Sequence, residues 1–558
     1  MASREYSTCC LRLVELPPRN KRYSIPAAGT RIAAVRAMSL REVLFVVTAV
    51  AACANQNALD VCDRAADYRA ECVGDYVTPP FCDADAQEAA EYLLSLSCDE
   101  ISNLAADGKA DGAFCDWFGA GCKPDELIFT GAACTSDASC ASGSSCVEKH
   151  CFANDGSELA SIMDRWTHSA ETAGSVTQLL DQNSETRGLR NQLMASAQQS
   201  IHFTALLIED DEAGRETIAA MAAAARRGVE VRVIVDATTQ YEFSSYDVLQ
   251  PLVAAGGQIL PYNPITEWAT LRWQIGINVN QRLHEKLLIV DGAHAVVGGR
   301  NVGDDYFVDG KWHDTCVYLR GPGVTDVQRM FLAEWDQFAA WEAQAGCPQQ
   351  EKYGFACPQQ AIASAATYTP AQPSVGTSRT RPIYSDPRSQ KTPLGYLAVL
   401  NLVRTAHETI YIANSYFVPP RRLRKHLKAA VDRGVRVVVV TNSLHSTDAW
   451  WMYYASLNYY KELIGAGIEI FQYRGTETMH AKTMLIDGKL AVIGSYNLDP
   501  RSAASNSEAL VTVRDGTAVG ELAADFQAML GYSDRASPDI SAADWVKAKT
   551  FKLVEPLL

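Results

Sequence analysis

Two separated parts of the chain show the same succession of apolar and amphipathic segments. In the first part, an apolar run at residues 201–208 is followed by a helical period at 214–227 and by a second apolar run at 229–235. Short apolar runs are typical of buried strands, and the segment between them is long enough for a helix. The pattern predicts a strand–helix–strand unit.

The same order recurs in the C-terminal part of the chain. Residues 409–413 and 435–440 are apolar runs, and residues 423–431 between them carry apolar positions at helical spacing. Both helices are followed by Arg-Gly-Val, which begins at Arg227 and at Arg433, with glycine where a helix end needs it. The sequence therefore predicts two repeats of one α/β fold.

Three further segments frame the repeats. A helix is predicted at residues 156–183, leading into the first repeat, and another at 542–553, after a turn that contains proline. Residues 346–379, between the repeats, are rich in Ala, Gln, Pro, Ser and Thr, which is the composition of a linker.

Each repeat contains one copy of the same polar motif. A His and a Lys stand two residues apart, an Asp follows the Lys by five residues, and an Asn follows the Asp by ten. The first copy is His284, Lys286, Asp291 and Asn301, and the second is His480, Lys482, Asp487 and Asn497. Two such matches are unlikely to arise by chance.

The spacing has a direct physical meaning on a strand. Residues two apart point to one face, so each His and Lys enter a site together while Glu285 or Ala481 faces away. The apolar residues that follow continue the strand into a core, and Asp-Gly is typical of a tight hairpin turn. The second arm brings a glycine-containing pair and the Asn back to the mouth of the site. There, backbone N–H groups of the pair and the amide are expected to approach an anion.

One His, one Lys and one Asn supply half of the groups that phosphodiester cleavage needs. One group must attack phosphorus while another protonates the leaving oxygen. A single His–Lys pair is more often part of a solvated strand face, but two intact copies predict one complete site.

The duplicated motif resembles the signature of the phospholipase D superfamily, and the resemblance extends over about residues 185–540. Within that superfamily the sequence is most similar to the cardiolipin synthase branch. The stretches that carry this similarity begin at Gly298, Ser415, Thr441 and Gly494. The first copy departs from the pattern at Gly299, where the second copy has Ser495.

The resemblance implies two phospholipase D-like domains that pack about a pseudo-twofold axis and bring both motifs to one phosphate. It also implies His284 as nucleophile and His480 as general acid and base, although the sequence itself does not distinguish the two. No metal or other cofactor is required, and a monomer suffices for a complete site. An acidic residue is expected to orient each His, and these residues are Asp314 and Glu508.

The remaining motif residues receive simpler roles. Gly299 and Ser495 are predicted to bind substrate. Asp291 and Asp487 lie on the hairpin turns, where a turn cap or an ion pair is the more common role of an Asp.

The composition of the chain limits the kinds of partner that are expected. A formal net charge of −15 and a pI near 5.2 disfavour nucleic acid held by a generic basic surface, so phospholipids and a membrane surface are the expected partners. A basic stretch at residues 421–425 is either an exposed helix face or a site for anionic headgroups. The aromatic residues around Trp450 and Trp451 are either part of the core or a wall where acyl chains enter.

Cysteine usage indicates an oxidising compartment. Ten of the sixteen cysteines lie between Cys62 and Cys151. Zinc binding is the alternative to a disulfide-stapled module, but C-x2-C pairs are missing and His150 is the one nearby histidine. Cys347 and Cys357 are expected to close a small loop in the linker, and Cys316 to be buried in a strand.

The N-terminal region resembles a bacterial lipoprotein leader. After Met38, an apolar run at residues 43–50 leads to a sequence that resembles a lipoprotein cleavage box and ends in Cys53. Lipidation of Cys53 would anchor an extracytoplasmic protein, with the outer membrane favoured. The expected organisation is a leader at 1–52, a disulfide module at 53–155, catalytic halves at 156–345 and 380–558, and a linker at 346–379.

Four functions follow in order of expectation. The first is a phosphatidyltransferase of the cardiolipin synthase type that acts through a phosphohistidine. The second is a hydrolytic phospholipase D, which uses water on the same intermediate. A secreted nuclease and a non-catalytic binding protein come last, because the net charge disfavours the nuclease and the two intact motifs disfavour the binding protein.

Overall fold

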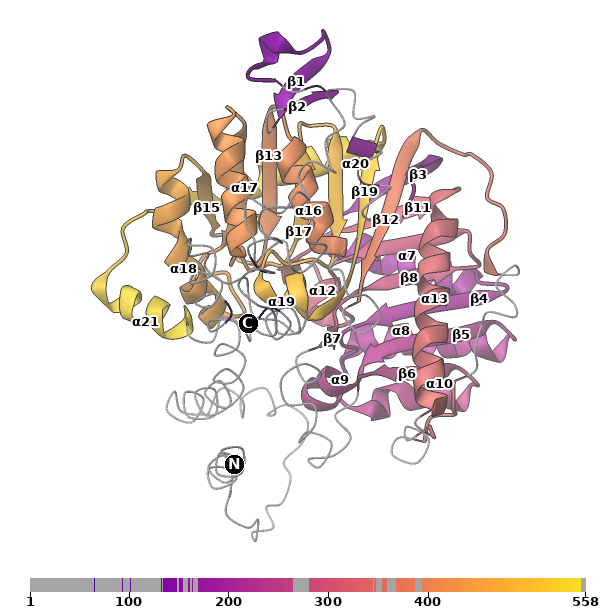
Figure 1. Ribbon diagram of the computed structural model, residues 1–558. Coiled ribbons are helices and arrows are strands. Elements are labelled where there is room, and N and C mark those ends of the chain that lie inside the picture. The colour runs from indigo at the N-terminus through magenta and orange to yellow at the C-terminus, as the bar shows by residue number, and fades with distance from the viewer. Residues whose placement is uncertain are drawn as a thin grey trace. The chain divides into compact units, whose positions relative to one another are not determined.

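The structure is a computed structural model that describes mainly residues 169–263, 281–344, 371–386 and 394–552 (Figure 1). It also describes most of a cysteine-rich hairpin at residues 134–153. Contacts divide the chain into two units, residues 1–124 and residues 125–556. Both motif-bearing halves and the hairpin belong to the second unit, so the predicted module boundary at residue 155 lies inside it. Cys53 and the cysteines from Cys62 to Cys122 lie outside the described residues.

The first half alternates strands and helices. Its strands are β3 (Thr172–Leu180), β4 (Ser200–Ala205), β5 (Glu230–Asp236), β6 (Gln258–Tyr262), β7 (Arg282–Leu283), β8 (Leu287–Val290), β9 (His294–Gly298), β10 (Trp312–His313) and β11 (Cys316–Arg320). Its helices are α7 (Asn183–Ser196), α8 (Glu212–Arg226), α9 (Ala237–Phe243), the 3-10 helix η5 (Tyr246–Leu249), α10 (Gln250–Ala254), α12 (Asp304–Phe307) and α13 (Gly323–Gln344).

The second half repeats this order. Its strands are β12 (Ser378–Ser385), β13 (Thr409–Asn414), β14 (Arg436–Asn442), β15 (Glu469–Tyr473), β16 (Thr478–Met479), β17 (Lys482–Ile486), β18 (Leu490–Gly494), β19 (Asn506–Arg514) and β20 (Ser533–Arg535). Its helices are α16 (Leu394–Thr405), α17 (Arg421–Asp432), α18 (Trp450–Gly465), α19 (Pro500–Ala504), α20 (Thr517–Gly531) and α21 (Ala542–Lys552).

One continuous sheet joins the two halves in the described part of the chain. Its order is β20-β15-β14-β13-β17-β18-β19-β12-β3-β11-β9-β8-β4-β5-β6. From the β12–β3 junction outward, each half shows its first strand, its last long strand, the two strands of the motif hairpin and then three parallel strands. The second half adds the antiparallel strand β20 at its outer edge. The junction itself is antiparallel. This order is the predicted pseudo-twofold repeat, and the two halves share a sheet rather than forming separate sandwiches.

Helices cover both faces of the sheet. On one face, α13 and α20 share a core with side chains from both halves. On the other face, α7, α8 and α10 cover the first half, and α16, α17 and α18 cover the second. In the motif hairpin, Leu287 and Ile289 enter the shared core while Leu288 and Val290 enter the opposite one. This alternation explains why β8 is apolar throughout.

The helix predicted at residues 156–183 is wrong over its second part, because Thr172–Leu180 form β3. This strand pairs with β11 on one side and with β12 on the other. It is therefore a central strand whose partners lie far away in the sequence. The predicted βαβ units, the glycine-terminated helices and the final helix are confirmed.

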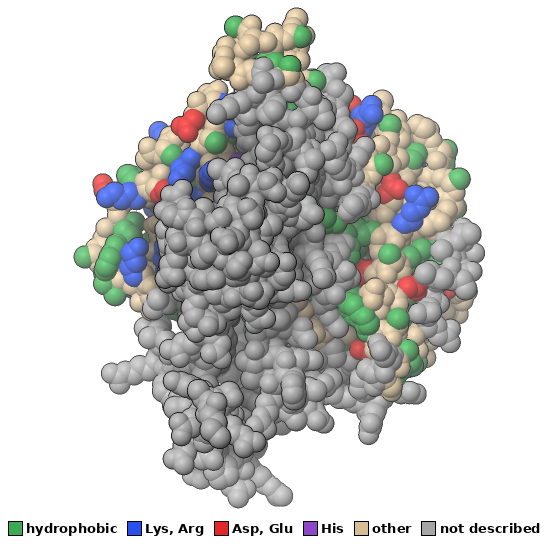
Figure 2. All heavy atoms as spheres, viewed as in Figure 1, with side chains coloured by type: hydrophobic (Ala, Val, Ile, Leu, Met, Phe, Trp, Pro, Cys, Tyr) green, Lys and Arg blue, Asp and Glu red, His purple; other side chains and the backbone are tan. Residues whose placement is uncertain are grey.

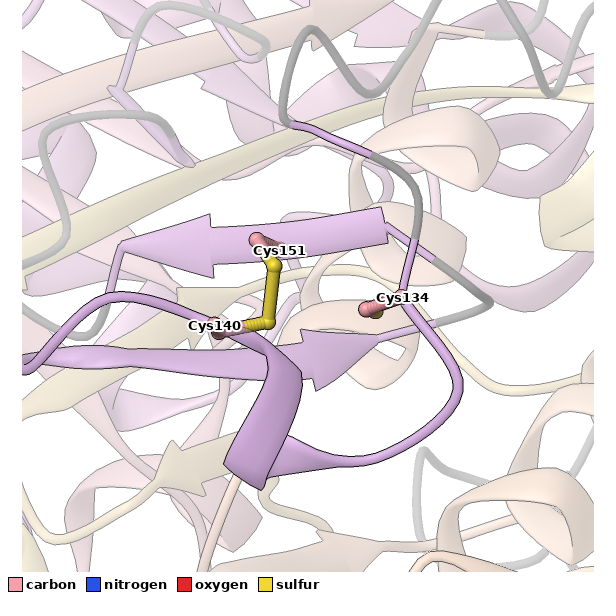
Figure 3. Close-up of side chains that lie close together, drawn as sticks. All are labelled: Cys134, Cys140 and Cys151. Carbon is pink, nitrogen blue, oxygen red and sulfur yellow. A yellow bond between two sulfur atoms is a disulfide. The ribbon is translucent and has the colours of Figure 1, made fainter.

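Disulfides connect the cysteines of the hairpin. Cys134 bonds to Cys146 and Cys140 bonds to Cys151, so the close group of Cys134, Cys140 and Cys151 is not a set of free thiolates (Figure 3). Phe152 of β2 (His150–Ala153), which pairs with β1 (Ser144–Val147), is 1% exposed and packs into the core of the second half.

The three later cysteines also match their predictions. Cys347 bonds to Cys357 in the segment between the halves, and Cys316 is a buried free thiol on β11. Among the described residues, the helices are all too short or too polar to cross a membrane.

Candidate active site

Each motif histidine directly follows a short strand that pairs with the other half of the protein. Strand β7, directly before His284, pairs in parallel with the start of β19, directly before Glu508. Strand β16, directly before His480, pairs in parallel with β10, directly before Asp314. This exchange places each His against the carboxylate of the opposite repeat.

His284 and Glu508 form the first pair. Nδ1 of His284 lies 3.0 Å from both carboxylate oxygens of Glu508. Because an ionised carboxylate only accepts hydrogen bonds, Nδ1 carries the proton and Nε2 keeps its lone pair. Burial lowers the pKa of His284 to about 4, against the attraction of Glu508. His284 is therefore a neutral imidazole with a defined tautomer.

His480 and Asp314 form the second pair. Nδ1 of His480 lies 2.6 Å from Oδ2 of Asp314, whose other oxygen accepts from the backbone N–H of Thr315 at 2.7 Å. Burial opposes ionisation of Asp314, but Lys482 and His480 outweigh it and hold the pKa of this carboxyl at about 2. Burial and then Lys482 lower the pKa of His480. Asp314 thus stays anionic beside an imidazole that can accept a proton at Nε2.

Both lysines are buried behind the histidines. Burial lowers the pKa of Lys286 to about 7 and that of Lys482 to about 8. Lys482 Nζ donates to Oγ of Ser415 at 3.0 Å, and each lysine also donates to the carbonyl of its own histidine. A phosphate anion in the site would favour their charged forms, since an adjacent negative charge raises the pKa of an amine.

Two asparagine amides complete the motif residues. Asn301 Nδ2 donates to the hydroxyl of Tyr306 at 3.0 Å, so its N–H groups are partly engaged. The Oδ1 atoms of Asn301 and Asn497 are buried without a hydrogen-bond partner in the described part of the structure. Amide oxygens accept hydrogen bonds, so these atoms require a donor such as a hydroxyl group, whereas a phosphate oxygen would accept from the Nδ2 groups.

Aromatic rings surround one histidine of the two. The ring centroids of Trp312, Tyr306 and Tyr416 lie 5.1, 5.4 and 6.1 Å from that of His480. Among the described residues, His284 makes no such ring contact. Tyr306 and Tyr416 lie in stretches that carry the family resemblance, and Trp312 lies two residues before Asp314, but sequence reasoning assigned none of these rings to the site.

Gly299 and Ser495, which were predicted to bind substrate, make hydrogen bonds within the protein. Their backbone N–H groups donate to Thr315 and Ala509 in the sheet, and Ser495 Oγ is buried and donates to Glu508. A Cβ placed on Gly299 would lie 2.3 Å from Oδ1 of Asp314. The first copy therefore has glycine because Asp314 occupies the space that a side chain would need.

Glu508 receives more hydrogen bonds than Asp314. Besides His284, its donors are Ser495 Oγ, Ser502 Oγ at 2.6 Å and Asn506 Nδ2 at 3.3 Å. Burial opposes ionisation of Glu508, but His284 and Lys286 lower its pKa overall. Ser502 closes the sequence stretch that begins at Gly494, so the family motif contained a signal for it.

Asp291 and Asp487 have the structural role predicted for them. The carboxylate of Asp291 accepts from the backbone N–H groups of residues 198–200, at 2.7–3.2 Å. Asp487 binds residues 407–409 in the same way. Each aspartate thereby ties its hairpin turn to the start of the neighbouring strand.

Glu285, which faces away from the site, is fully buried. Ser507 Oγ donates to its carboxylate, directly behind the pair of His284 and Glu508. Burial raises the pKa of Glu285 to about 7. Glu285 therefore links the end of β7 to β19 on the side that faces away from the site.

The fold and the paired histidines define a duplicated α/β protein in which His and carboxylate side chains of both repeats are paired across the two halves. A family model described as "Cardiolipin synthase, PLD-like domain" matches residues 191–335 and 399–530, which are the two halves. The chain belongs to the phospholipase D superfamily and falls in its cardiolipin synthase branch.

Curated relatives agree with this placement. The chain is 31% identical to the probable cardiolipin synthase YwiE of Bacillus subtilis (strain 168), over 62% of this chain and 64% of the relative. It is 28% identical to cardiolipin synthase 2 of Bacillus cereus, over 68% of this chain and 70% of that protein. The match to the Bacillus subtilis protein therefore spans just under two thirds of its length.

Solved structures support the fold. The phosphatidylserine synthase of Haemophilus influenzae Rd KW20 superposes with a TM-score of 0.54 at 14% identity, covering 72% of this chain and all of that one.

Proposed function

We propose that the protein is a phosphatidyltransferase of the cardiolipin synthase type, acting on phospholipid phosphodiesters through a phosphohistidine. The observation that carries the proposal is the crossed pairing of two buried histidines with two anionic carboxylates. One site then holds two imidazoles of defined tautomer, two lysines and two amides, which are the groups that double displacement at phosphorus needs. The family and the curated relatives support the lipid substrate.

In the first step, Nε2 of His284 attacks phosphorus. The bond from phosphorus to the oxygen of the leaving alcohol breaks, and protonated His480 transfers its Nε2 proton to that oxygen. Asp314 stabilises the imidazolium form of His480, and the lysines balance the charge that develops on the phosphoryl oxygens. The products are a phosphatidyl group on His284 and a free alcohol.

In the second step, neutral His480 takes the proton from the hydroxyl of an acceptor lipid. The acceptor oxygen attacks phosphorus, the bond from phosphorus to nitrogen breaks, and His284 is released. Water in place of the lipid alcohol would give phosphatidic acid, which is the outcome of the alternative function, a hydrolytic phospholipase D.

The aromatic surroundings favour a lipid acceptor over water. Tyr306, Trp312 and Tyr416 contact His480, and Tyr416 also donates to Asp448, next to the start of α18. Apolar rings exclude water from a reactive intermediate. Trp450 packs against Phe551 and Trp451 is 39% exposed, so the aromatic segment is in part core and in part surface.

Product analysis with phosphatidylglycerol in mixed micelles tests the transfer. Cardiolipin should exceed phosphatidic acid, and replacing both Trp450 and Trp451 with Ala should shift the product towards phosphatidic acid. If the unaltered protein yields chiefly phosphatidic acid at high phosphatidylglycerol, the hydrolase is the correct function. Cleavage of DNA without turnover of lipid would instead support a nuclease.

We also propose that the protein is an extracytoplasmic lipoprotein anchored through Cys53, with the outer membrane as the favoured location. The disulfides of the hairpin support an oxidising compartment. Labelled palmitate should enter the unaltered protein but not the Cys53→Ser variant. A mature protein that begins at Met1 or Met38 would contradict this proposal.

A further inference from the structure

The outer face of the C-terminal helix is apolar and basic. Helix α21 buries Ala548 against the second half but leaves Trp545 53% exposed and Val546 58% exposed. Exposed apolar side chains mark an interaction surface when they lie together and polar or charged residues surround them. The helix also carries three lysines, which are Lys547, Lys549 and Lys552.

Contacts with α18 fix which face of α21 points outward. Asn458 Nδ2 donates to the carbonyl of Ala548 at 2.7 Å, and Lys547 Nζ donates to the hydroxyl of Tyr454 at 2.9 Å. The ring of Phe551 lies 5.2 Å from that of Trp450. Because these contacts use one side of α21, Trp545 and Val546 cannot turn inward without breaking them.

Basic side chains of α21 and α17 meet on α18, where Glu462 pairs with Arg424 at 3.2 Å. Lys552 Nζ and the guanidinium of Arg424 lie 5.6 and 4.1 Å from the centre of the same Tyr459 ring. Lys549 lies 5.8 Å from the ring of Trp545. Figure 2 shows hydrophobic and basic side chains next to each other along the left edge, where Figure 1 places α18 and α21.

The composition of this face is informative because the whole chain is acidic. A formal net charge of −15 repels an anionic bilayer, so close approach requires a local exception. Lysines around an exposed Trp are the side chains that bind anionic headgroups and the acyl boundary together.

The same side of the protein leads to the candidate active site. Leu444 is 47% exposed and Trp451 is 39% exposed, and both lie near Asp448 in sequence. Asp448 accepts from the hydroxyl of Tyr416, whose ring contacts His480. Trp451 contacts Trp450, whose ring packs against Phe551 of α21, so the start of α18 connects α21 to the segment that carries Asp448.

We propose that the outer face of α21, centred on Trp545, Val546 and Lys549, rests on an anionic phospholipid bilayer and directs the site towards its lipid substrate. This inference rests on the proposed function, since it concerns how the same site reaches phospholipid. It adds a contact that acts independently of any lipid on Cys53.

Vesicle flotation tests the surface. The full chain carrying Cys53→Ser, which lacks the lipidation residue, is mixed with vesicles of phosphatidylglycerol and phosphatidylcholine or of phosphatidylcholine alone. Trp545→Ser with Val546→Ser should weaken binding to the anionic vesicles about tenfold, and Lys549→Glu should weaken it further. The matched control is Tyr241→Ser with Phe243→Ser, which removes two side chains that are 69% and 67% exposed in the first half and should bind normally.

Turnover of monomeric short-chain phosphatidylglycerol separates this inference from the proposed function. The Trp545 and Val546 variant should retain this turnover, because the substrate needs no bilayer. Normal vesicle binding by this variant, or an equal loss in the control variant, would overturn the inference while leaving the function intact. If the parent chain dimerises and the Trp545 and Val546 variant does not, the face instead binds a second copy of this chain. If the unaltered protein does not turn over short-chain phosphatidylglycerol, the proposed function itself is contradicted.

Discussion

The two histidines occupy equivalent positions in the repeat but different surroundings. The side chain of His284 is 12% exposed. Its partner Glu508 also accepts hydrogen bonds from Ser495, Ser502 and Asn506. The side chain of His480 is 5% exposed and is enclosed by three aromatic rings. The repeat therefore supplies the backbone, while residues outside the motif give each imidazole its own environment.

This difference suggests a division of labour. A carboxylate with several donors stabilises an imidazolium less, which keeps His284 neutral and suited to attack phosphorus. Asp314 has fewer hydrogen-bond donors among the described residues and is better able to stabilise protonated His480. On this reasoning we propose His284 as the nucleophile and His480 as the general acid and base.

The largest expected effect comes from removing either histidine. His284→Ala and His480→Ala should each reduce phosphatidylglycerol turnover by about 10³-fold or more, because both imidazoles act on one phosphate. His294→Ala is the matched control, because His294 forms a hydrogen bond with Tyr318 on the sheet of the first half and belongs to neither motif pair. Half of the normal activity in either single variant would indicate two independent sites.

The two carboxylates should be separable by leaving group. Asp314→Asn and Glu508→Gln are each expected to slow turnover of phosphatidylglycerol about 10²-fold, since each loses the partner that orients its histidine. With a phosphatidyl ester of 4-nitrophenol, departure needs no proton. The first-turnover release of nitrophenol should then recover in Asp314→Asn but stay slow in Glu508→Gln. If the release of nitrophenol recovers only in Glu508→Gln, the roles of the two histidines are the reverse of those proposed.

The glycine and serine of the two copies should not be interchangeable. Gly299→Ser should displace Asp314, because its Cβ would meet a carboxylate oxygen, and should lower activity about tenfold or more. Ser495→Gly removes one of several donors to Glu508, so a loss of only a few-fold is expected. Steady-state kinetics of both variants check this order, and a larger loss in Ser495→Gly would contradict it.

The smallest effect is a gain in stability. Lys286→Met should raise the free energy of unfolding by roughly 1–3 kcal/mol while abolishing turnover, since burial of the amine is unfavourable. Folding lowers the pKa of Lys286 from 10.5 to about 7, so the cost of burying its charge is fully present below pH 7. The gain should therefore shrink as the pH rises from 7 towards 10.5. Urea unfolding at several pH values measures it, and a gain that grows with pH would refute this account.

Local patterns in the sequence predicted much of the fold. The spacing of His284, Lys286 and Asp291 identified a hairpin, and the structure shows that hairpin with Asp291 as its structural cap. The two βαβ units and the repeat followed from hydrophobic periodicity. Strand β3 was missed because its partners, β11 and β12, are distant in the sequence and its own residues alternate only weakly.

The site was less predictable than the fold. Asp314 and Glu508 were expected as orienting residues, but their assignment to the opposite halves depends on the pairing of β7 with β19 and of β10 with β16. No local pattern encodes such pairing. Only the strand register reveals that the backbone N–H groups of Gly299 and Ser495, which were predicted to bind substrate, donate to Thr315 and Ala509.

Trapping the covalent intermediate tests the central claim most directly. The His480→Ala protein and the His284→Ala protein are each incubated with the 4-nitrophenyl ester of a labelled phosphatidyl group, quenched in base and analysed by peptide mass spectrometry. The account predicts label on His284 in the His480→Ala protein and none in the His284→Ala protein. Label on His480 in the His284→Ala protein, with none on His284 in the other variant, would contradict it.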